Sequence, residues 1–154
     1  MKAVVKYQPW ITLLFRLILG GVLFVAGAVK VSDPYGSATS VRAYQMLPVD
    51  LANLLGFTLP FIEIVIGAFL IAGVWVRVMA SAGAMLMVAF IIAIGQAWAR
   101  GISLDCGCFG KGGLLDTEEL PTLSYTLEIL RDIALAAIGI YLYRFPRGKL
   151  GLDK

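Results

Sequence analysis

Histidine is absent from this sequence of 154 residues, and cysteine occurs only twice. Without histidine, the chain lacks the commonest proton shuttle and the commonest ligand of transition metals. Charged residues make up 15% and hydrophobic residues 60% of the chain, whereas soluble domains have about 25% and about 45–50%. The mean hydropathy of +0.87 agrees with a membrane protein in a lipid bilayer. The net charge of +3 does not indicate nucleic-acid binding, because most cations lie beside apolar runs, where membrane topology explains them.

Four apolar runs define the expected architecture, at residues 10–29, 51–76, 78–99 and 124–143. Each is long enough to cross a hydrocarbon core of about 30 Å, which takes roughly 20 helical residues. We expect helices, because an isolated strand would leave its backbone polar groups unsatisfied in lipid. The sequence therefore predicts an all-α membrane protein, with residues 1–154 forming a single domain that is a four-transmembrane-helix bundle.

The connections between these runs differ in length. Two long loops, at residues 30–50 and 100–123, contrast with a tight hairpin at residues 75–77. Asp50 is a suitable N-cap residue at the start of the second helix, and Pro60 is expected to bend that helix.

The distribution of basic residues predicts the orientation of the bundle. Lys and Arg are more frequent near the two termini and the tight hairpin than in the two long loops. By the positive-inside rule, both termini are cytoplasmic and both long loops are extracytoplasmic. The aromatic residues expected at the inner membrane interface are Trp10, Trp75, Tyr141 and Tyr143, and those expected at the outer interface are Trp98 and Tyr125.

Both cysteines lie in one glycine-rich stretch, LDCGCFGKGG, at residues 104–113. The Cα atoms of Cys106 and Cys108 are at most about 7 Å apart, which is the upper limit for a disulfide. A ring this small would be strained, and strained, exposed disulfides have the high potentials of labile or catalytic pairs. On the extracytoplasmic side, the pair therefore favours redox chemistry.

Two other interpretations of the cysteine pair stay open. The pair can be a structural disulfide, although closing so short a loop removes little entropy from the unfolded chain. It can also capture a soft metal ion. Zinc and iron–sulfur sites need about four ligands, so only two-coordinate ions such as Cu(I) or Hg(II) suit two thiols. No resident metal is expected.

Five ionisable residues fall within the apolar runs, and such residues are functional candidates because burying charge in a membrane is costly. They are Arg16, Glu63, Glu128, Arg131 and Asp132.

Their depths can be estimated from the helical rise. Glu63 lies roughly 18 Å from Trp75, and Arg131 roughly 19 Å from Arg144, at about 1.5 Å per residue. We therefore expect an ion pair between Glu63 and Arg131, with Asp132 as the competing partner. Arg16 either stretches toward this pair or extends to the inner surface. The pair has two interpretations: it fixes helix register, or Glu63 exchanges protons with a nearby carrier.

Two motifs lie in the first apolar run and at its end: FRLILG at residues 15–20, and AGAVK at residues 26–30, followed by DP. They resemble the first-helix pattern of the MauE/DoxX family of redox-associated membrane proteins. The motif LPFIE at residues 59–63 is similar to its second-helix pattern, and DCGCFG at residues 105–110 resembles the signature of the MauE branch. The Arg131-Asp132 pair in the last run also fits.

This resemblance implies a four-helix bundle in the bacterial cytoplasmic (inner) membrane with a role in extracytoplasmic thiol–disulfide chemistry. The MauE branch is associated with maturation of methylamine dehydrogenase alongside a thioredoxin-like partner, and the DoxX branch with quinone-coupled sulfur oxidation. The expected function is electron exchange through Cys106 and Cys108, between a thioredoxin-like protein or larger redox complex and a membrane carrier such as quinone. An enzyme of this kind would be a quinone-linked thiol–disulfide oxidoreductase.

The expected carrier-binding residues surround the cysteine loop. Glu63, Arg131 and Asp132 would manage charge and protons near the quinone, and Trp98 or Phe109 would cover its ring. Two alternatives are a non-catalytic subunit or assembly factor of a redox complex, and a soft-metal transporter that binds Cu(I) or Hg(II).

Overall fold

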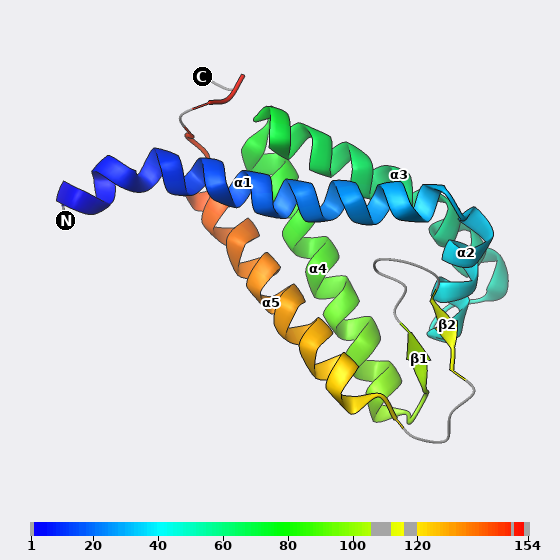
Figure 1. Ribbon diagram of the computed structural model, residues 1–154. Coiled ribbons are helices and arrows are strands. Elements are labelled where there is room, and N and C mark those ends of the chain that lie inside the picture. The colour runs from blue at the N-terminus through cyan, green and yellow to red at the C-terminus, as the bar shows by residue number, and fades with distance from the viewer. Residues whose placement is uncertain (1, 106–111, 116–119, 149, 153–154) are drawn as a thin grey trace.

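The computed structural model describes residues 2–105, 112–115, 120–148 and 150–152. Five helices and two short strands follow one another along the chain (Figure 1). Their bounds are α1 Lys2–Val31, α2 Pro34–Ala43, α3 Val49–Ala72, α4 Val76–Ala99, β1 Leu104–Asp105, β2 Gly113–Leu114 and α5 Thr122–Arg144. The predicted helical class is confirmed, and the four long helices begin and end within a few residues of the predicted runs, except that α1 starts earlier.

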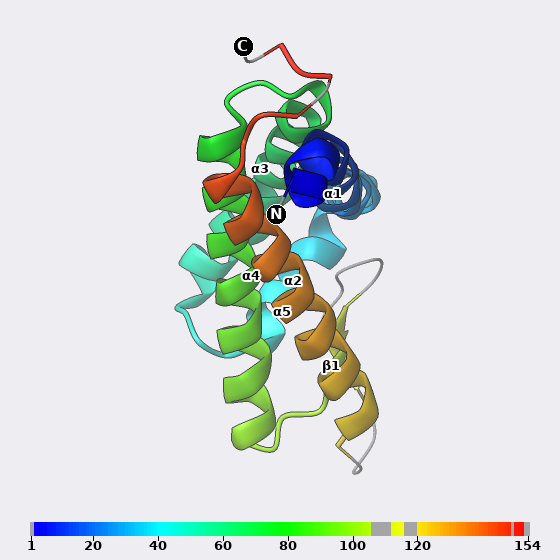
Figure 2. The ribbon, with the colours of Figure 1, turned by 90° about the vertical axis from the view of Figure 1, so that its left-hand side faces the viewer.

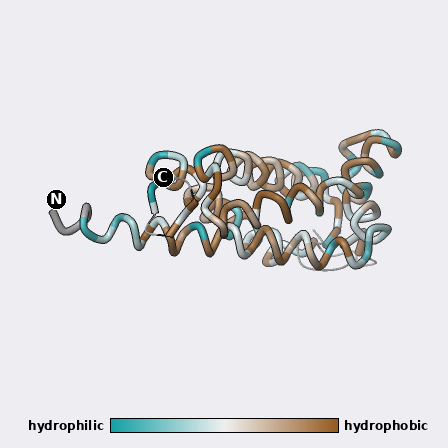
Figure 3. Tube along the Cα trace, turned by 90° about the horizontal axis from the view of Figure 1, so that it is seen from above, coloured by the Kyte–Doolittle hydropathy of each residue, from teal (hydrophilic) through white to brown (hydrophobic). Residues whose placement is uncertain are grey.

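Three segments are long and apolar enough to span a membrane: Lys6–Val31, Val49–Ala72 and Val76–Ala99. Helix α5 has 23 residues but is not among them, because Glu128, Arg131 and Asp132 all fall within it. Figure 3 shows that hydrophobic residues dominate these long helices. Four spans therefore remain a prediction, whereas three candidate spans are established.

The long helices form two antiparallel pairs, α1 with α3 and α4 with α5 (Figures 1 and 2). Both termini lie at one end of the molecule, and α2 with the two strands lies at the other, where the pairs diverge. This arrangement agrees with the predicted placement of termini and long loops on opposite sides. Which side is cytoplasmic remains a prediction.

Helices α1 and α3 approach closely because small residues face each other. A Cβ at Gly67 would lie 2.6 Å from the Gly20 carbonyl oxygen, and a Cβ at Gly27 would lie 2.5 Å from that of Pro60. Small residues of this kind allow helix backbones to approach within membranes. The main core joins both pairs and comprises Leu19, Leu23, Ile66, Leu70, Val76, Ala80, Met87, Leu135, Ala136 and Leu142.

Helix α3 differs from expectation at both ends. Its N-cap is Pro48, and Asp50 lies in the first turn, so the predicted N-cap was wrong. The helix ends at Gly73, whose φ of 72° gives the left-handed conformation common after a helix. The tight turn to α4, at residues 73–75, is therefore two residues earlier than predicted and ends at Trp75, which has a φ of 46°.

Helix α3 continues through Pro60. Proline has no N–H, so Pro60 cannot donate to the carbonyl of Gly56, four residues earlier. The Ser37 hydroxyl of α2 donates to that carbonyl instead, at 2.7 Å. Docking of α2 on α3 thus supplies a donor to the carbonyl that Pro60 leaves without one.

Each long loop contains structure that the sequence did not predict. Helix α2 begins at Asp33, whose side chain accepts from the Gly36 N–H at 3.0 Å. In the second loop, β1 and β2 pair antiparallel, with Leu104 opposite Leu114 and Asp105 opposite Gly113. In the sequence, the two cysteines fall between β1 and β2.

Candidate functional site

An ion pair between α1 and α3 is buried in the bundle. The Lys30 ammonium donates to both carboxylate oxygens of Glu63, at 2.7 and 3.0 Å. Lys30 is 8% exposed and Glu63 is fully buried. The predicted Glu63–Arg131 pair was therefore wrong, because a nearer cation occupies the carboxylate.

The position of Lys30 explains why it can reach Glu63. Side chains of a helix lean toward its N-terminus, so Lys30, one residue before the end of α1, points back along the helix into the bundle. Glu63 belongs to the antiparallel helix α3 and leans toward the same level. Sequence reasoning placed Lys30 in the outer loop and missed it. Its long apolar stem, next to the last turn of a span, was the available signal.

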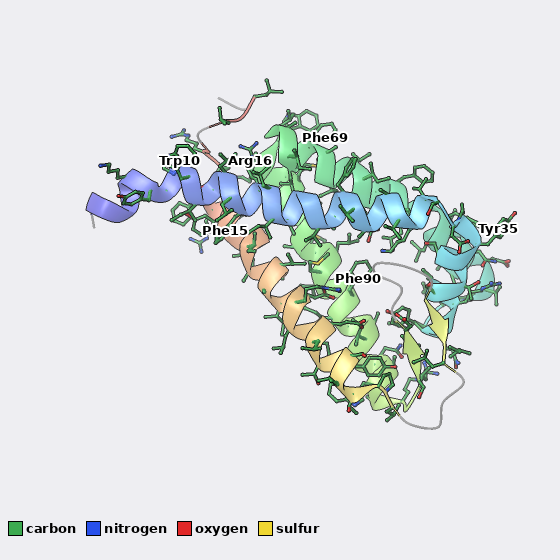
Figure 4. The ribbon with its side chains drawn as sticks, in the orientation of Figure 1. Trp10, Phe15, Arg16, Tyr35, Phe69 and Phe90 are labelled. Atoms are coloured by element: carbon green, nitrogen blue, oxygen red, sulfur yellow. The ribbon has the colours of Figure 1, made fainter. Side chains whose placement is uncertain are left out.

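Phe90 of α4 contributes the third side of this contact. The Lys30 ammonium lies 5.3 Å from the centre of the Phe90 ring, a cation–π distance. Phe90 projects from α4 toward the other helix pair (Figure 4). The ammonium group is therefore enclosed by a carboxylate and an aromatic face.

A second ion pair lies on α5. The Arg131 guanidinium donates to Asp132 Oδ1 from Nε at 2.9 Å and from Nη2 at 2.8 Å. Asp132, the competing partner in the predicted ion pair, is thus confirmed as the partner of Arg131. Asp132 is buried, and among the described residues its other oxygen, Oδ2, has no hydrogen-bond partner.

The two ion pairs line the same small cavity, and we call these four residues, Lys30, Glu63, Arg131 and Asp132, the charge cluster. The cavity has a volume of about 20 Å³ and its other walls are mainly apolar. A water molecule needs about 10–15 Å³ by this measure, so the cavity has room for one. The predicted common level of Glu63 and Arg131 is confirmed, although the partners differ.

The base of the β1–β2 hairpin is fixed to α5 by Tyr125. Its buried hydroxyl donates to the Ile102 carbonyl at 2.5 Å and accepts from the Leu104 N–H at 2.9 Å. Trp98 packs against Tyr125 with ring centres 6.0 Å apart. Tyr125 is fully buried against the protein, and its level at the outer membrane interface stays a prediction. Trp98 is half-buried in this contact and does not line the charge-cluster cavity.

A larger pocket adjoins the hairpin on its α2 side. Its volume is about 500 Å³, and it is lined by Thr39, Arg42, Ala43, Gly112, Gly113 and Leu114. This volume lies in the range of small-molecule sites. Cys106, Cys108 and Phe109 lie outside the described residues, and Gly112 and Gly113 directly follow their segment.

Arg16, the remaining candidate, lies far from the charge cluster. Its guanidinium donates to the carbonyls of Leu70 and Ile71, at 2.9 and 3.0 Å, and to that of Leu150 at 2.5 Å. It lies beside the C-terminal segment (Figure 4). Arg16 therefore neither joins the charge cluster nor extends to the surface, as the two predicted positions required: it is 1% exposed and caps α3.

Comparison with known proteins gives one family. A family model described as methylamine utilisation protein MauE matches residues 8–145, from α1 to the residue after α5. No curated protein and no solved structure matches the chain. The matched range contains the charge cluster, Arg16 and the cysteine pair, which supports the resemblance found in the motifs. The chain belongs to the MauE family.

Proposed function

We propose that this MauE-family chain is a thiol–disulfide redox protein of the bacterial cytoplasmic membrane. Cys106 and Cys108 exchange electrons with an extracytoplasmic thioredoxin-like protein and pass them to a membrane carrier such as quinone. The observation that carries the proposal is the position of the hairpin bearing the C-x-C pair. Tyr125, which fixes its base, precedes Asp132 of the charge cluster on α5 by seven residues, or about 10 Å.

The chain length between the strands supports contact with the charge cluster. Seven residues, 106–112, close the hairpin between Asp105 and Gly113. Three or four extended residues reach about 10–14 Å, which matches the distance from Tyr125 to Asp132. By chain length alone, the segment that holds the cysteines is long enough to span the distance between the base of the hairpin and the charge cluster.

The proposed exchange proceeds through a mixed disulfide. A thiolate of the partner attacks one sulfur of the Cys106–Cys108 disulfide, and the other cysteine leaves as a thiolate. The partner's second thiolate then attacks the mixed disulfide, which releases the oxidised partner. Cys106 and Cys108 have then gained two electrons and, as thiols, two protons.

The charge cluster supplies groups that can move those protons. Asp132 and Glu63 are among the residues that line a cavity with room for one water molecule, and within the described chain Asp132 Oδ2 has no hydrogen-bond partner. Lys30 and Arg131 balance the charge of the two carboxylates in their ionised form. In this proposal, these residues act as a buried proton store for the thiols.

The volumes of the two cavities bear on a quinone site. The charge-cluster cavity, at about 20 Å³, is far smaller than the roughly 300 Å³ of a small ligand site. The pocket beside the hairpin has sufficient volume, and Thr39, Arg42 and Leu114 would hold a ring there. A bound quinone would supply a two-electron, two-proton acceptor.

A redox titration of the purified protein in detergent tests the proposal. Free thiols are trapped by alkylation and counted by intact mass, with and without added quinone. We expect a reversible two-electron couple, well above the potentials of structural disulfides, that quinone oxidises. Cys106→Ser and Cys108→Ser abolish the couple. Glu63→Gln slows oxidation of the thiols, whereas Asp50→Asn, an exposed carboxylate in the same helix, leaves the rate unchanged.

Two results would contradict the proposal and select an alternative. A pair that stays oxidised under all but harsh reduction is a structural disulfide and favours the assembly-factor function. Thiols that stay reduced and bind one equivalent of Cu(I) or Hg(II) favour the soft-metal function.

A further inference from the structure

We propose that the end of the molecule opposite the hairpin binds the phosphate-bearing headgroup of an anionic phospholipid. The site is a pocket of about 350 Å³ between α1, the start of α4 and the end of α5. Its walls are formed by Gln8, Arg77, Arg144, Phe145, Pro146 and Arg147. This proposal does not depend on the thiol chemistry.

Three guanidinium groups share this pocket, and no carboxylate lines it. Within the described part of the chain, the ion pairs are Lys30–Glu63 and Arg131–Asp132, so none of the three arginines is paired with an acid. The contact of Arg77 is with the Tyr143 ring, 5.6 Å from its centre. Three unpaired cations around one cavity repel one another, and a bound anion would relieve that repulsion.

The chemistry of the walls selects phosphate among anions. Arginine presents planar, forked donors that match phosphate oxygens in bidentate geometry. The Gln8 amide adds a further donor from α1. The ring of Phe145 and Pro146 provide apolar surface beside the arginines, as expected where a headgroup continues into acyl chains.

The fold holds these residues in place before any ligand binds. The Thr12 hydroxyl donates to the Phe145 carbonyl at 3.1 Å, and Arg16 donates to Leu150. These contacts fix the segment after α5 against the first half of α1, with Arg147 between them. A preorganised site loses less entropy on binding.

The level of the pocket along the helices favours a lipid over a soluble ligand. Arg77 is the second residue of the candidate span Val76–Ala99. Trp10, Trp75 and Tyr143, at the same end, are 52%, 62% and 48% exposed. Exposed Trp and Tyr side chains at the ends of spans mark the headgroup region, and basic pockets between helices at this level bind acidic headgroups.

Native mass spectrometry of the detergent-purified protein tests the proposal. Phosphatidylglycerol, phosphatidylcholine and inorganic phosphate are titrated separately. We expect phosphatidylglycerol to bind more tightly than phosphatidylcholine. Arg147→Gln weakens its binding about fivefold, and Arg144→Gln with Arg147→Gln about 25-fold. Lys6→Gln, which removes an exposed cation outside the pocket at the same end, changes it less than about twofold.

Three results would overturn the proposal. One is equal affinity of the wild type and the folded Arg147→Gln variant for phosphatidylglycerol. Another is equal affinity of the wild type for the acidic and the zwitterionic lipid. The third is arginine-dependent binding of inorganic phosphate that displaces the lipid, which would identify a soluble phosphate compound as the ligand. Circular dichroism confirms that each variant is folded, and Arg147, exposed and outside the helices, is the position least expected to affect folding.

Discussion

Arg16 and Lys30 are both buried basic residues of α1, about 21 Å apart along the helix, but their partners differ. Within the described part of the chain, Arg16 donates to backbone carbonyls at the end of α3 and in the C-terminal segment. Lys30 pairs with a carboxylate beside a cavity that a second ion pair also lines. Burial of a charge in a membrane protein thus has more than one use, and the chemistry of the partners distinguishes a helix cap from an ion pair between helices.

The largest expected effect comes from separating Lys30 and Glu63. Lys30→Met leaves the Glu63 carboxylate buried without its cation and destabilises the protein by about 3–5 kcal/mol. Glu63→Leu has an effect of similar size. The double variant is close to the wild type, since replacing a whole buried pair with apolar residues is often neutral. Chemical unfolding in detergent measures all three, and a double variant as unstable as the sum of the single variants would contradict the pairing.

Arg16 should behave differently, because no single second substitution can compensate for its loss. Arg16→Gln leaves carbonyls at the end of α3 without their donor and destabilises the protein by about 2–4 kcal/mol. The redox potential of the thiols stays unchanged. Arg42→Gln, at an exposed arginine, changes stability by less than about 0.5 kcal/mol. A shift in thiol potential in Arg16→Gln would remove the distinction between the two sites.

The contact between α1 and α3 sets the position of Lys30 relative to Glu63. Gly27→Ala places a Cβ 2.5 Å from the Pro60 carbonyl oxygen, so the helices must move apart. We expect a loss of about 1–3 kcal/mol. Gly21→Ala is the matched control, because a Cβ there meets no atom within 4 Å. It should be neutral or slightly stabilising in an unfolding titration.

The smallest effect is expected at the base of the hairpin. Tyr125→Phe removes the hydroxyl that joins Ile102 and Leu104, and costs about 1–2 kcal/mol. Amide exchange at Leu104 becomes faster, while exchange within α1 does not change. Tyr35→Phe, at a tyrosine that is 79% exposed, is the control. Unchanged exchange at Leu104 in Tyr125→Phe would show that the hairpin has another anchor.

Several structural features had a signal in the sequence that was not used. Asp33 followed by Pro34 is a typical helix start, with a side-chain cap and a proline in the first turn, and it begins α2. Gly73 is a typical residue after a helix, and it ends α3. Tyr125 was assigned to the membrane interface because its type is common there, but burial of its hydroxyl depends on a loop contact that no local pattern reveals.

The long helices, their approximate bounds and the level of the buried charges could be predicted, because apolar length and the rise per residue are local properties. The MauE motifs could also be recognised before the fold was known, and the family is confirmed. The pairing of the charges could not be predicted in this way. Lys30, Arg131 and Arg16 were all within plausible reach of a partner, and the choice among them depends on the rotation and close approach of α1, α3 and α5. Those are set by packing at Gly20, Gly27 and Gly67, which brings Lys30 to Glu63 and leaves Arg131 to Asp132.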